Sequence, residues 1–391
     1  MFFLAESAAM HDLLTADEIS FQHEVADLVR ARVAPFAEKA DREERLPSDS
    51  WSALAEAGLL GVAIPREFGG LGRSLMHMAI ALEEVSARCP STALSYGAHS
   101  ILCAYNLFSH GNDLLRRAFL PELCSGARGG AFAITEPGAG SDATGLATRA
   151  RRDGDAYLLN GGKTFITNGP FADVVLVYAR TSAENERRAL SALMVEASLP
   201  GFSVSRNLKK LGFRGSPTSE LMFTDCRVPA DRMLGREGDG IAIMMASLDV
   251  ERALLSAIPL GMARRCLDLM RPVVRGERRT QEAESAVADA LVGIEALRGL
   301  LTRAVRCLDR TERATVPASC AKLYGSEMIM QVASACVDVT VGTAAQPEAE
   351  RLFRDAKLIA IGAGTSQVQK LILARSLLDG EPAREHAHAG V

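Results

Sequence analysis

Three glycine-bearing loops of this sequence carry side chains that could hold a cofactor. The first, residues 135–142, contains Gly138 and Gly140. Glycine lets backbone N–H groups approach an anionic or aromatic ligand closely, and Thr135 and Ser141 add hydroxyl donors. On spacing alone, a plain strand-to-turn connection is the better interpretation of this loop. Its glycines also differ from the G-x-G-x-x-G pattern that opens a helix, so a Rossmann nicotinamide site is not supported.

Two further loops have a similar composition. Residues 165–169 place Phe165 beside the hydroxyl of Thr167 at the end of a predicted strand. Residues 362–367 open the last predicted helix, where free N–H groups and the helix dipole favour carbonyl or phosphate oxygens. Each loop is a weak sign of a binding site by itself. The presence of all three in one chain makes simple turns a less satisfactory explanation.

One glutamate lies in an apolar helical segment. Glu251 follows Leu248 and precedes Leu254 and Leu255, in a stretch that is apolar almost all round. Such a stretch indicates a buried helix. Burial disfavours a charged carboxylate, so the pKa of Glu251 should rise, as a base acting on a weak carbon acid requires. The competing interpretation is a solvated glutamate paired with Arg252, and composition alone favours it because most helix glutamates lie on the surface.

The spacing of apolar residues changes twice along the chain, and it predicts the helices and strands that must position these side chains. In the first third, apolar residues recur at spacings of three and four, which predicts helices, the first of them capped by Asp17. From about Gly129, short apolar runs between turns predict strands. After residue 240 the helical period returns. Helices are expected near 51–60, 76–87, 98–108, 241–271, 281–310, 317–339 and 366–378, and strands include 157–159, 174–178, 193–195 and 221–223.

This order of elements predicts an α+β protein. We expect an N-terminal helical domain over residues 1–128, a middle β domain over 129–240 and a C-terminal helical domain over 241–391. A length of 391 residues is enough for two or three domains with buried cores. With 48% hydrophobic and 24% charged residues, the composition is globular and excludes disordered and collagen-like classes.

Charge and cysteine usage narrow the classes of partner and ligand. The formal net charge of −4 provides no basic field for a nucleic-acid backbone, so nucleic acid is not expected as a partner. The eight cysteines form no C-x-x-C pair and no cluster with histidine, which argues against a metal site and a disulfide framework. We expect reduced cysteines that pack in the core of a cytoplasmic protein.

Signals for secretion or membrane insertion are weak. The first residues are apolar only briefly, lack a basic leader and meet Glu6, which is unlike a signal peptide. No stretch reaches the roughly 18 apolar residues that a membrane-spanning helix needs. We therefore expect an intracellular protein without a membrane span.

Four segments resemble motifs of the acyl-CoA dehydrogenase family, in the family's order and spacing. The resemblance covers residues from about 12 to 379, and several stretches are closer still to the isovaleryl-CoA dehydrogenases. The family motifs match residues 133–142, 160–169, 210–221 and 364–369, and the isovaleryl-type stretches are 94–100, 168–174, 248–252, 354–358 and 361–366.

The resemblance implies an FAD-dependent enzyme that desaturates an acyl thioester between its α and β carbons. It also implies helical, β-barrel and four-helix-bundle domains, a homo-oligomer (tetramer or dimer), and electron-transfer flavoprotein or another electron acceptor. The implied cofactor-binding residues are Phe132, Ile134, Thr135, Gly140, Ser141, Phe165, Ile166, Thr167, Gln281, Thr365, Ser366 and Gln367. The implied substrate-binding residues are Ser141, Asp249, Arg252, Ala363 and Gly364.

The catalytic base follows from the same resemblance. Most of the family carries its base where this chain has Ala363, whereas the isovaleryl type carries it within the stretch matched by 248–252, so Glu251 inherits the role. Desaturation needs a base at the α-carbon while a hydride leaves the β-carbon for flavin N5. The small residues Gly362 and Ala363 leave room for a branched acyl chain, and the Ala363 N–H would polarise the thioester carbonyl. Arg252 would contact the CoA portion or pair with Glu251.

Two segments, 275–281 and 338–345, depart from the family pattern that holds the adenine half of FAD. The first lacks a Phe-Gly pair and keeps Gln281, and the second places Asp338 where the family has an amide. An acid there would repel a pyrophosphate. These changes leave three interpretations beside an acyl-CoA substrate: an acyl group on a carrier protein in natural-product biosynthesis, a flavin monooxygenase or oxidase on the same fold, and an inactive relative.

Overall fold

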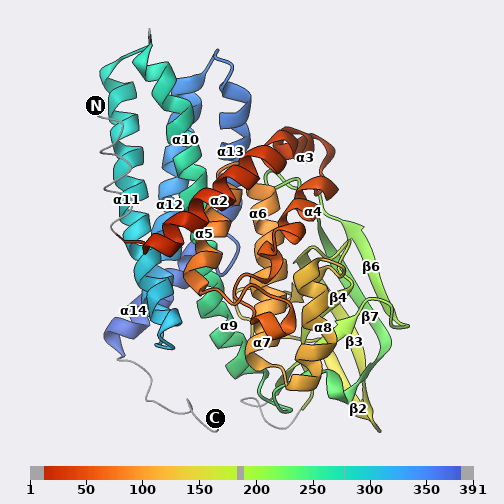
Figure 1. Ribbon diagram of the computed structural model, residues 1–391. Coiled ribbons are helices and arrows are strands. Elements are labelled where there is room, and N and C mark those ends of the chain that lie inside the picture. The colour runs from red at the N-terminus through yellow and green to blue at the C-terminus, as the bar shows by residue number, and fades with distance from the viewer. Residues whose placement is uncertain (1–12, 183–188, 277, 380–391) are drawn as a thin grey trace.

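The computed structural model describes residues 13–182, 189–276 and 278–379. Helices make up the first and last thirds of the chain, and strands the middle (Figure 1). The first strand begins at Gly130 and the helices resume at Gly240. The domain limits at 129 and 241 remain a prediction. The prediction about a signal peptide concerns the first residues of the chain, which lie outside the described residues.

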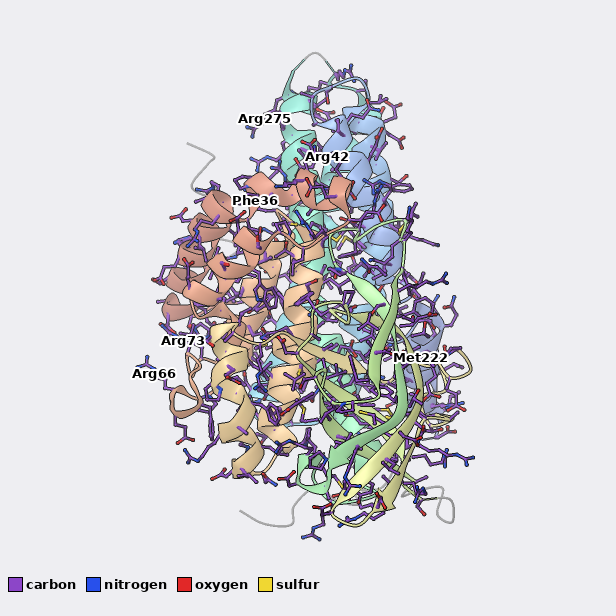
Figure 2. All side chains as sticks on the ribbon, turned by 90° about the vertical axis from the view of Figure 1, so that its right-hand side faces the viewer. Phe36, Arg42, Arg66, Arg73, Met222 and Arg275 are labelled. Carbon is purple, nitrogen blue, oxygen red and sulfur yellow. The ribbon has the colours of Figure 1, made fainter. Side chains whose placement is uncertain are left out.

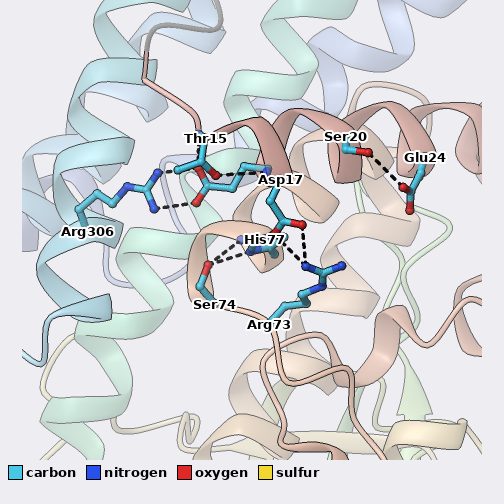
Figure 3. Close-up of polar contacts among 9 residues, drawn as sticks. Thr15, Asp17, Ser20, Glu24, Arg73, Ser74, His77 and Arg306 are labelled. Carbon is cyan, nitrogen blue, oxygen red and sulfur yellow. Dashed lines mark hydrogen bonds and ion pairs between the residues drawn. The ribbon is translucent and has the colours of Figure 1, made fainter.

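The first helix, α2 (Ala16–Arg32), begins one residue after Thr15. The Thr15 side chain accepts a hydrogen bond from the Glu18 N–H, and the Glu18 carboxylate accepts one from the Thr15 N–H at 2.8 Å. The prediction of Asp17 as the cap is therefore wrong, because Asp17 already lies inside the helix. Its carboxylate instead contacts Arg73 at 2.8 Å and His77 at 2.9 Å, as Figure 3 shows.

The helices of the first third lie between the C-terminal bundle on one side and the sheet on the other (Figure 1). The prediction did not include α6 or α8. α6 starts with Pro90, a position where a helix tolerates proline because its first N–H groups have no partner within the helix. The elements are α3 (Ala37–Glu43), α4 (Ser48–Glu56), α5 (Leu75–Ser86), α6 (Pro90–Gly97), η4 (Ala98–Tyr105), α7 (Asn106–His110) and α8 (Asp113–Ser125), with short 3-10 turns η1 (Ala34–Phe36), η2 (Leu59–Gly61) and η3 (Arg66–Phe68).

The middle of the chain forms an eight-stranded sheet with the order β6-β7-β3-β2-β4-β5-β8, and β1 runs parallel to β4. The pairing of β3 with β7 shifts register between Lys163 and Ile166. Such an irregularity re-aims side chains, and it lies where the predicted loop 165–169 begins. The strands are β1 (Gly130–Ala133), β2 (Arg149–Asp153), β3 (Ala156–Thr167), β4 (Val174–Arg180), β5 (Leu190–Glu196), β6 (Phe202–Asn207), β7 (Thr218–Pro229) and β8 (Met233–Leu234), with the 3-10 turn η6 (Ala230–Arg232) before β8.

The last third forms a bundle of long helices that projects beyond the sheet, with Arg275 at its far end (Figures 1 and 2). The helix predicted over 241–271 is divided at Ser256, and α13 is a helix that the sequence pattern did not predict. The elements are α9 (Gly240–Leu255), α10 (Ala257–Arg275), α11 (Gln281–Asp309), α12 (Thr315–Thr340), α13 (Gln346–Ile359) and α14 (Ser366–Leu378).

One apolar core joins the first and last thirds. Leu82 and Val85 of α5 share a buried cluster with Ile258 and Leu260 of α10. A second cluster joins η4 and α8 to the inner face of β4 and β5. The sheet and both groups of helices are thus packed through continuous cores, which hold the segments around them in fixed positions.

The described residues include no helix that is both long and apolar enough to cross a membrane. In the same part of the chain, no group of three or more His, Cys, Asp or Glu side chains could hold a metal ion.

Candidate active site

A cavity of about 760 Å³ lies where the loop after β1, the end of β3, helix α9 and the turn before α14 meet. Apolar residues Leu94, Ala98 and Leu102 from α6 and η4 line part of its wall. Among the residues predicted from the sequence, the cavity is lined by Phe132, Ile134, Thr135, Gly140, Ser141, Phe165, Ile166, Thr167, Glu251, Arg252, Ala363, Gly364 and Thr365. The fold therefore brings all three glycine-bearing loops and the candidate base to one place.

The first loop is anchored by a buried ion pair between Glu136 and Lys163. The Lys163 ammonium donates to Glu136 Oε1 at 2.7 Å and to the Ile134 carbonyl at 3.0 Å. The same carboxylate accepts from the Ala147 N–H at 2.6 Å and the Thr148 N–H at 3.0 Å. Burial acts to raise the pKa of Glu136, but these hydrogen bonds outweigh it and hold the pKa below its usual value.

The second loop ends β3 beside the cavity. Phe165 has a left-handed φ of 58° and exposes 69% of its surface, whereas Ile166 is buried. The following Asn168 is buried, and its amide donates to the Ser95 carbonyl at 2.8 Å and the Gly130 carbonyl at 3.1 Å. Asn168 thus ties the end of β3 to α6 and to the start of β1, which fixes this wall of the cavity.

The third loop is a tight turn before α14. Ala363 has φ 56° and Gly364 φ 79°, and a left-handed conformation is strained for a residue with a side chain. The buried Gln369 amide stabilises the turn by donating to the Ala363 carbonyl at 3.3 Å and the Gly364 carbonyl at 3.1 Å. Thr365 caps the helix by accepting from Val368 N–H at 3.2 Å. Thr365 and Val368, at the start of α14, both line the cavity.

Glu251 lies on α9 with 7% of its surface exposed. Burial raises the pKa of its carboxyl to about 7, and the nearby charges of Arg252 and Lys322 oppose that rise. The predicted burial of this helix segment and the predicted direction of the pKa shift agree with the structure. A carboxylate with a pKa near neutrality can accept a proton and release it at the same pH.

Arg252 is paired with Asp249 rather than with Glu251. Its guanidinium lies 3.0 Å from Asp249 Oδ1, and Asp249 Oδ2 accepts from the Thr315 hydroxyl at 2.5 Å. Arg252 lines the cavity but Asp249 does not. Asp249 therefore orients Arg252 from outside the cavity. A direct contact between Asp249 and the substrate remains a prediction.

Three predicted cofactor residues do not line the cavity. Ser366 is buried within the first turn of α14, and Gln367 is exposed. Gln281 is exposed at the start of α11. Contacts of these residues with FAD remain predictions.

The two segments that depart from the family pattern lie next to each other at the far end of the bundle. The Arg278 guanidinium donates to the Val341 carbonyl, so the turn before α11 touches the end of α12. Residue 277, within the first of these segments, lies outside the described residues. Neither segment lines the cavity.

Lys322 is a cavity residue that the sequence reasoning missed. It comes from α12 and exposes 4% of its surface. A signal was present in the sequence: a lone lysine with no Asp or Glu three or four residues away on either side, in an otherwise apolar segment. Isolated lysines of this kind are ordinarily surface residues, so only the structure distinguishes this one.

Comparisons with known proteins now identify the family. The acyl-CoA dehydrogenase N-terminal domain matches residues 15–127, its middle domain 131–226 and its C-terminal domain 238–378. The chain belongs to the acyl-CoA dehydrogenase family. The mitochondrial isovaleryl-CoA dehydrogenase of Arabidopsis thaliana is 37% identical over 93% of this chain and 92% of its own. These matches confirm the expected family, the fold class and the enzyme class, a flavin-dependent oxidoreductase.

Solved structures agree with this assignment. Butyryl-CoA dehydrogenase from Megasphaera elsdenii has a TM-score of 0.90 and 31% identity, over 93% of this chain and 99% of its own. The prolyl acyl carrier protein oxidase AnaB has a TM-score of 0.89 and 29% identity, over the same shares. The FAD complex of PigA has a TM-score of 0.89 and 27% identity, over 93% and 98%.

The residues that line the cavity fit a flavin. Phe132, Ile134 and Ile166 form apolar walls for a flat ring, and the hydroxyl side chains around them can bond the polar edge of such a ring. A Cβ placed on Gly140 would meet no atom within 4 Å, so its backbone faces open space and is free to approach a ligand. This donor set matches the isoalloxazine of FAD.

Proposed function

We propose that the protein is an FAD-dependent dehydrogenase of a short, branched acyl thioester similar to isovaleryl-CoA. The observation that carries the proposal is Glu251, a carboxylate buried at the wall of the cavity with a pKa near neutrality. Bound FAD supplies the hydride acceptor for the substrate β-carbon.

The chain's own contribution is proton abstraction and carbonyl polarisation. Glu251 takes the proton from the substrate α-carbon, and its desolvated carboxylate is a stronger base than one in water. The Ala363 N–H donates to the thioester carbonyl oxygen, which stabilises the charge that develops when the α-proton leaves. Arg252, held by Asp249, presents a cation at the cavity wall for the carrier part of the substrate.

The branched, short acyl chain follows from the small residues at the turn and the apolar wall. Gly362 and Ala363 both line the cavity, and neither carries a side chain longer than a methyl group. Two larger apolar residues, Leu94 and Leu102, also line the cavity and provide an apolar surface for methyl branches.

The carrier of the acyl group has two candidates. Similarity to isovaleryl-CoA dehydrogenase favours CoA, and similarity to the prolyl acyl carrier protein oxidase favours a carrier protein. We propose CoA as the first choice. Electron-transfer flavoprotein or a similar acceptor, a homo-oligomer of two or four chains, and a cytoplasmic location complete the proposal.

The test is flavin reduction under anaerobic conditions. The purified, FAD-loaded protein is mixed with isovaleryl-CoA or with isovaleryl carried on an acyl carrier protein, and the visible flavin absorbance is followed. We expect rapid bleaching by one of the two and its loss in Glu251→Gln. Glu327→Gln, an exposed glutamate of α12 that pairs with Lys370, is the matched control and should bleach normally. Absence of bleaching with every short acyl thioester would overturn the proposal.

The same variants separate the remaining alternatives. In the presence of oxygen, a monooxygenase or oxidase that needs no α-proton base would keep its turnover in Glu251→Gln. An inactive relative would show no reduction and no stoichiometric FAD.

A further inference from the structure

Glu251, Arg252 and Lys322 line the cavity, and Asp249, which does not line it, pairs with Arg252. Asp249 and Glu251 come from α9, Arg252 comes from the same helix, and Lys322 comes from α12, which packs on α9. Asp249 and Arg252 are bonded to each other at 3.0 Å. This bond leaves Glu251 and Lys322 as the complementary pair of charges.

Both members of this second pair are buried. Glu251 exposes 7% and Lys322 4% of its surface, and both line the same cavity. Within the described residues the Lys322 ammonium has no hydrogen-bond partner. An isolated buried cation is costly, so an ammonium in this position needs an opposite charge near it.

We propose that the Lys322 ammonium is the counter-ion of the Glu251 carboxylate and favours the ionised form of that carboxylate in the cavity. The part of this proposal that concerns catalysis rests on the proposed function, because it assumes that Glu251 takes the α-proton. Lys322 acts through Glu251 and is a positioning residue.

The charges that face Glu251 support this assignment. Arg252 on α9 and Lys322 on α12 both lower the pKa of Glu251, and burial raises it more. Tyr178 of β4 is a buried phenol near Glu251. Burial is the main cause that raises the pKa of Tyr178, and the Glu251 charge raises it further, so the phenol stays neutral. Burial in turn lowers the pKa of Lys322 to about 8, and Glu251 opposes this change. Arg252 acts on Glu251 more strongly than Lys322 does, but its guanidinium is also paired with Asp249 at 3.0 Å. The Lys322 ammonium has no hydrogen-bond partner among the described residues.

The consequence is a defined pH range for the base. Glu251 accepts a proton only when it is ionised, so the rate of α-proton abstraction rises with pH through the pKa of Glu251. Removal of the Lys322 charge raises that pKa and moves the rise to higher pH. An opposite charge at close range ordinarily shifts a carboxyl pKa by about one unit or more.

A direct measurement of the Glu251 titration tests the proposal without substrate. Difference infrared spectra between each protein and its Glu251→Gln counterpart isolate the carboxyl band of Glu251 as a function of pH. In the FAD-loaded protein, Lys322→Met should move the midpoint upward by about one pH unit or more. Lys322→Gln tests the same loss of charge with a polar side chain, in case the methionine variant does not fold.

Two further variants serve as controls. Lys322→Arg keeps the charge and should return the midpoint to the wild-type value. Lys370→Met removes an exposed lysine of α14 that pairs with Glu327, and should leave the midpoint unchanged. An unchanged or lowered midpoint in both Lys322→Met and Lys322→Gln would overturn the proposal. It would also be overturned if the Lys322 variants changed only the affinity for the substrate.

The pH profile of flavin reduction by isovaleryl-CoA gives the functional readout. It should move in Lys322→Met by the same amount as the infrared midpoint. If no acyl thioester reduces the wild-type flavin, the proposed function fails, while the infrared midpoint still decides whether Lys322 is the counter-ion.

Discussion

Two buried glutamate–lysine pairs in this protein have opposite properties. Glu136 and Lys163 are joined at 2.7 Å beside the first loop, and Glu251 and Lys322 face the cavity without a hydrogen bond between them. The pKa of Glu136 lies below its usual value, whereas that of Glu251 is raised to about 7. The residue types and the exposed fractions of the two glutamates are similar, but Glu251 lies deeper, so its carboxyl loses more of its hydration.

Hydrogen bonds are the second difference between the two glutamates. The Glu136 carboxylate accepts from one ammonium and two backbone N–H groups, which replace the water that burial removed. Glu251 receives only longer-range help from cations, so desolvation dominates. A buried carboxylate with a full set of donors is a structural anchor, and one without them keeps the basicity that proton abstraction requires.

The largest expected effect that tests this contrast is on activity. Glu251→Gln should slow flavin reduction by isovaleryl-CoA by at least about 100-fold, since general bases ordinarily contribute 10²–10⁴. Its melting temperature should not fall, because the amide removes a buried charge. Stopped-flow absorbance and thermal unfolding measure the two properties, and a large loss of stability without loss of rate would reverse the contrast.

The second effect is on stability. Glu136→Gln leaves Lys163 as an uncompensated buried cation and should lower the free energy of unfolding by about 3–5 kcal/mol. Denaturant unfolding of the two glutamine variants side by side measures this difference. If Glu136→Gln unfolds at the wild-type denaturant concentration, the pair is not an anchor.

The two glutamates should also leave opposite signatures in the pH dependence of stability. The folded pKa of Glu251 lies above its ordinary 4.5, so the wild type loses stability as pH rises from about 4.5 to about 7. Glu251→Gln removes this loss and should gain relative stability over that range. The folded pKa of Glu136 lies below 4.5, so its contribution is present above 4.5 and disappears at lower pH. The deficit of Glu136→Gln should therefore shrink in acid. Unfolding curves at several pH values would show whether the two trends diverge.

The smallest expected effect is that of Lys322→Met on stability, which is compared with Lys163→Met. Lys163→Met removes a donor from Glu136 and should destabilise the protein by several kcal/mol, about the cost of breaking a buried pair. Lys322→Met removes a cation without a hydrogen bond, and with it the cost of burying that cation, so the free energy of unfolding should fall by less than it does in Lys163→Met. Equal losses in the two variants, measured by denaturant unfolding, would show that Lys322 is bonded in solution as firmly as Lys163.

Local sequence was sufficient for much of the fold. The period of three and four residues predicted α5 and α11, and the short apolar runs predicted β4 and β5, because these patterns reflect which face of an element is buried. It was insufficient for α13, whose buried face includes the charged residues Arg351 and Asp355. It was also insufficient for the cap of α2, where Thr15 and Asp17 are both acceptable capping residues. The choice between those two depends on the backbone conformation at the first turn.

The sequence by itself determined the family, the three glycine-bearing loops and the identity of the candidate base, because motif spacing and an apolar helix segment are local properties of the chain. Only the tertiary structure decided that α12 places Lys322 beside the same cavity as Glu251, and that Asp249 rather than Glu251 bonds Arg252. The physical reason is that the pKa of a carboxyl depends on the donors and charges within a few ångströms, and these come from segments far apart in the chain.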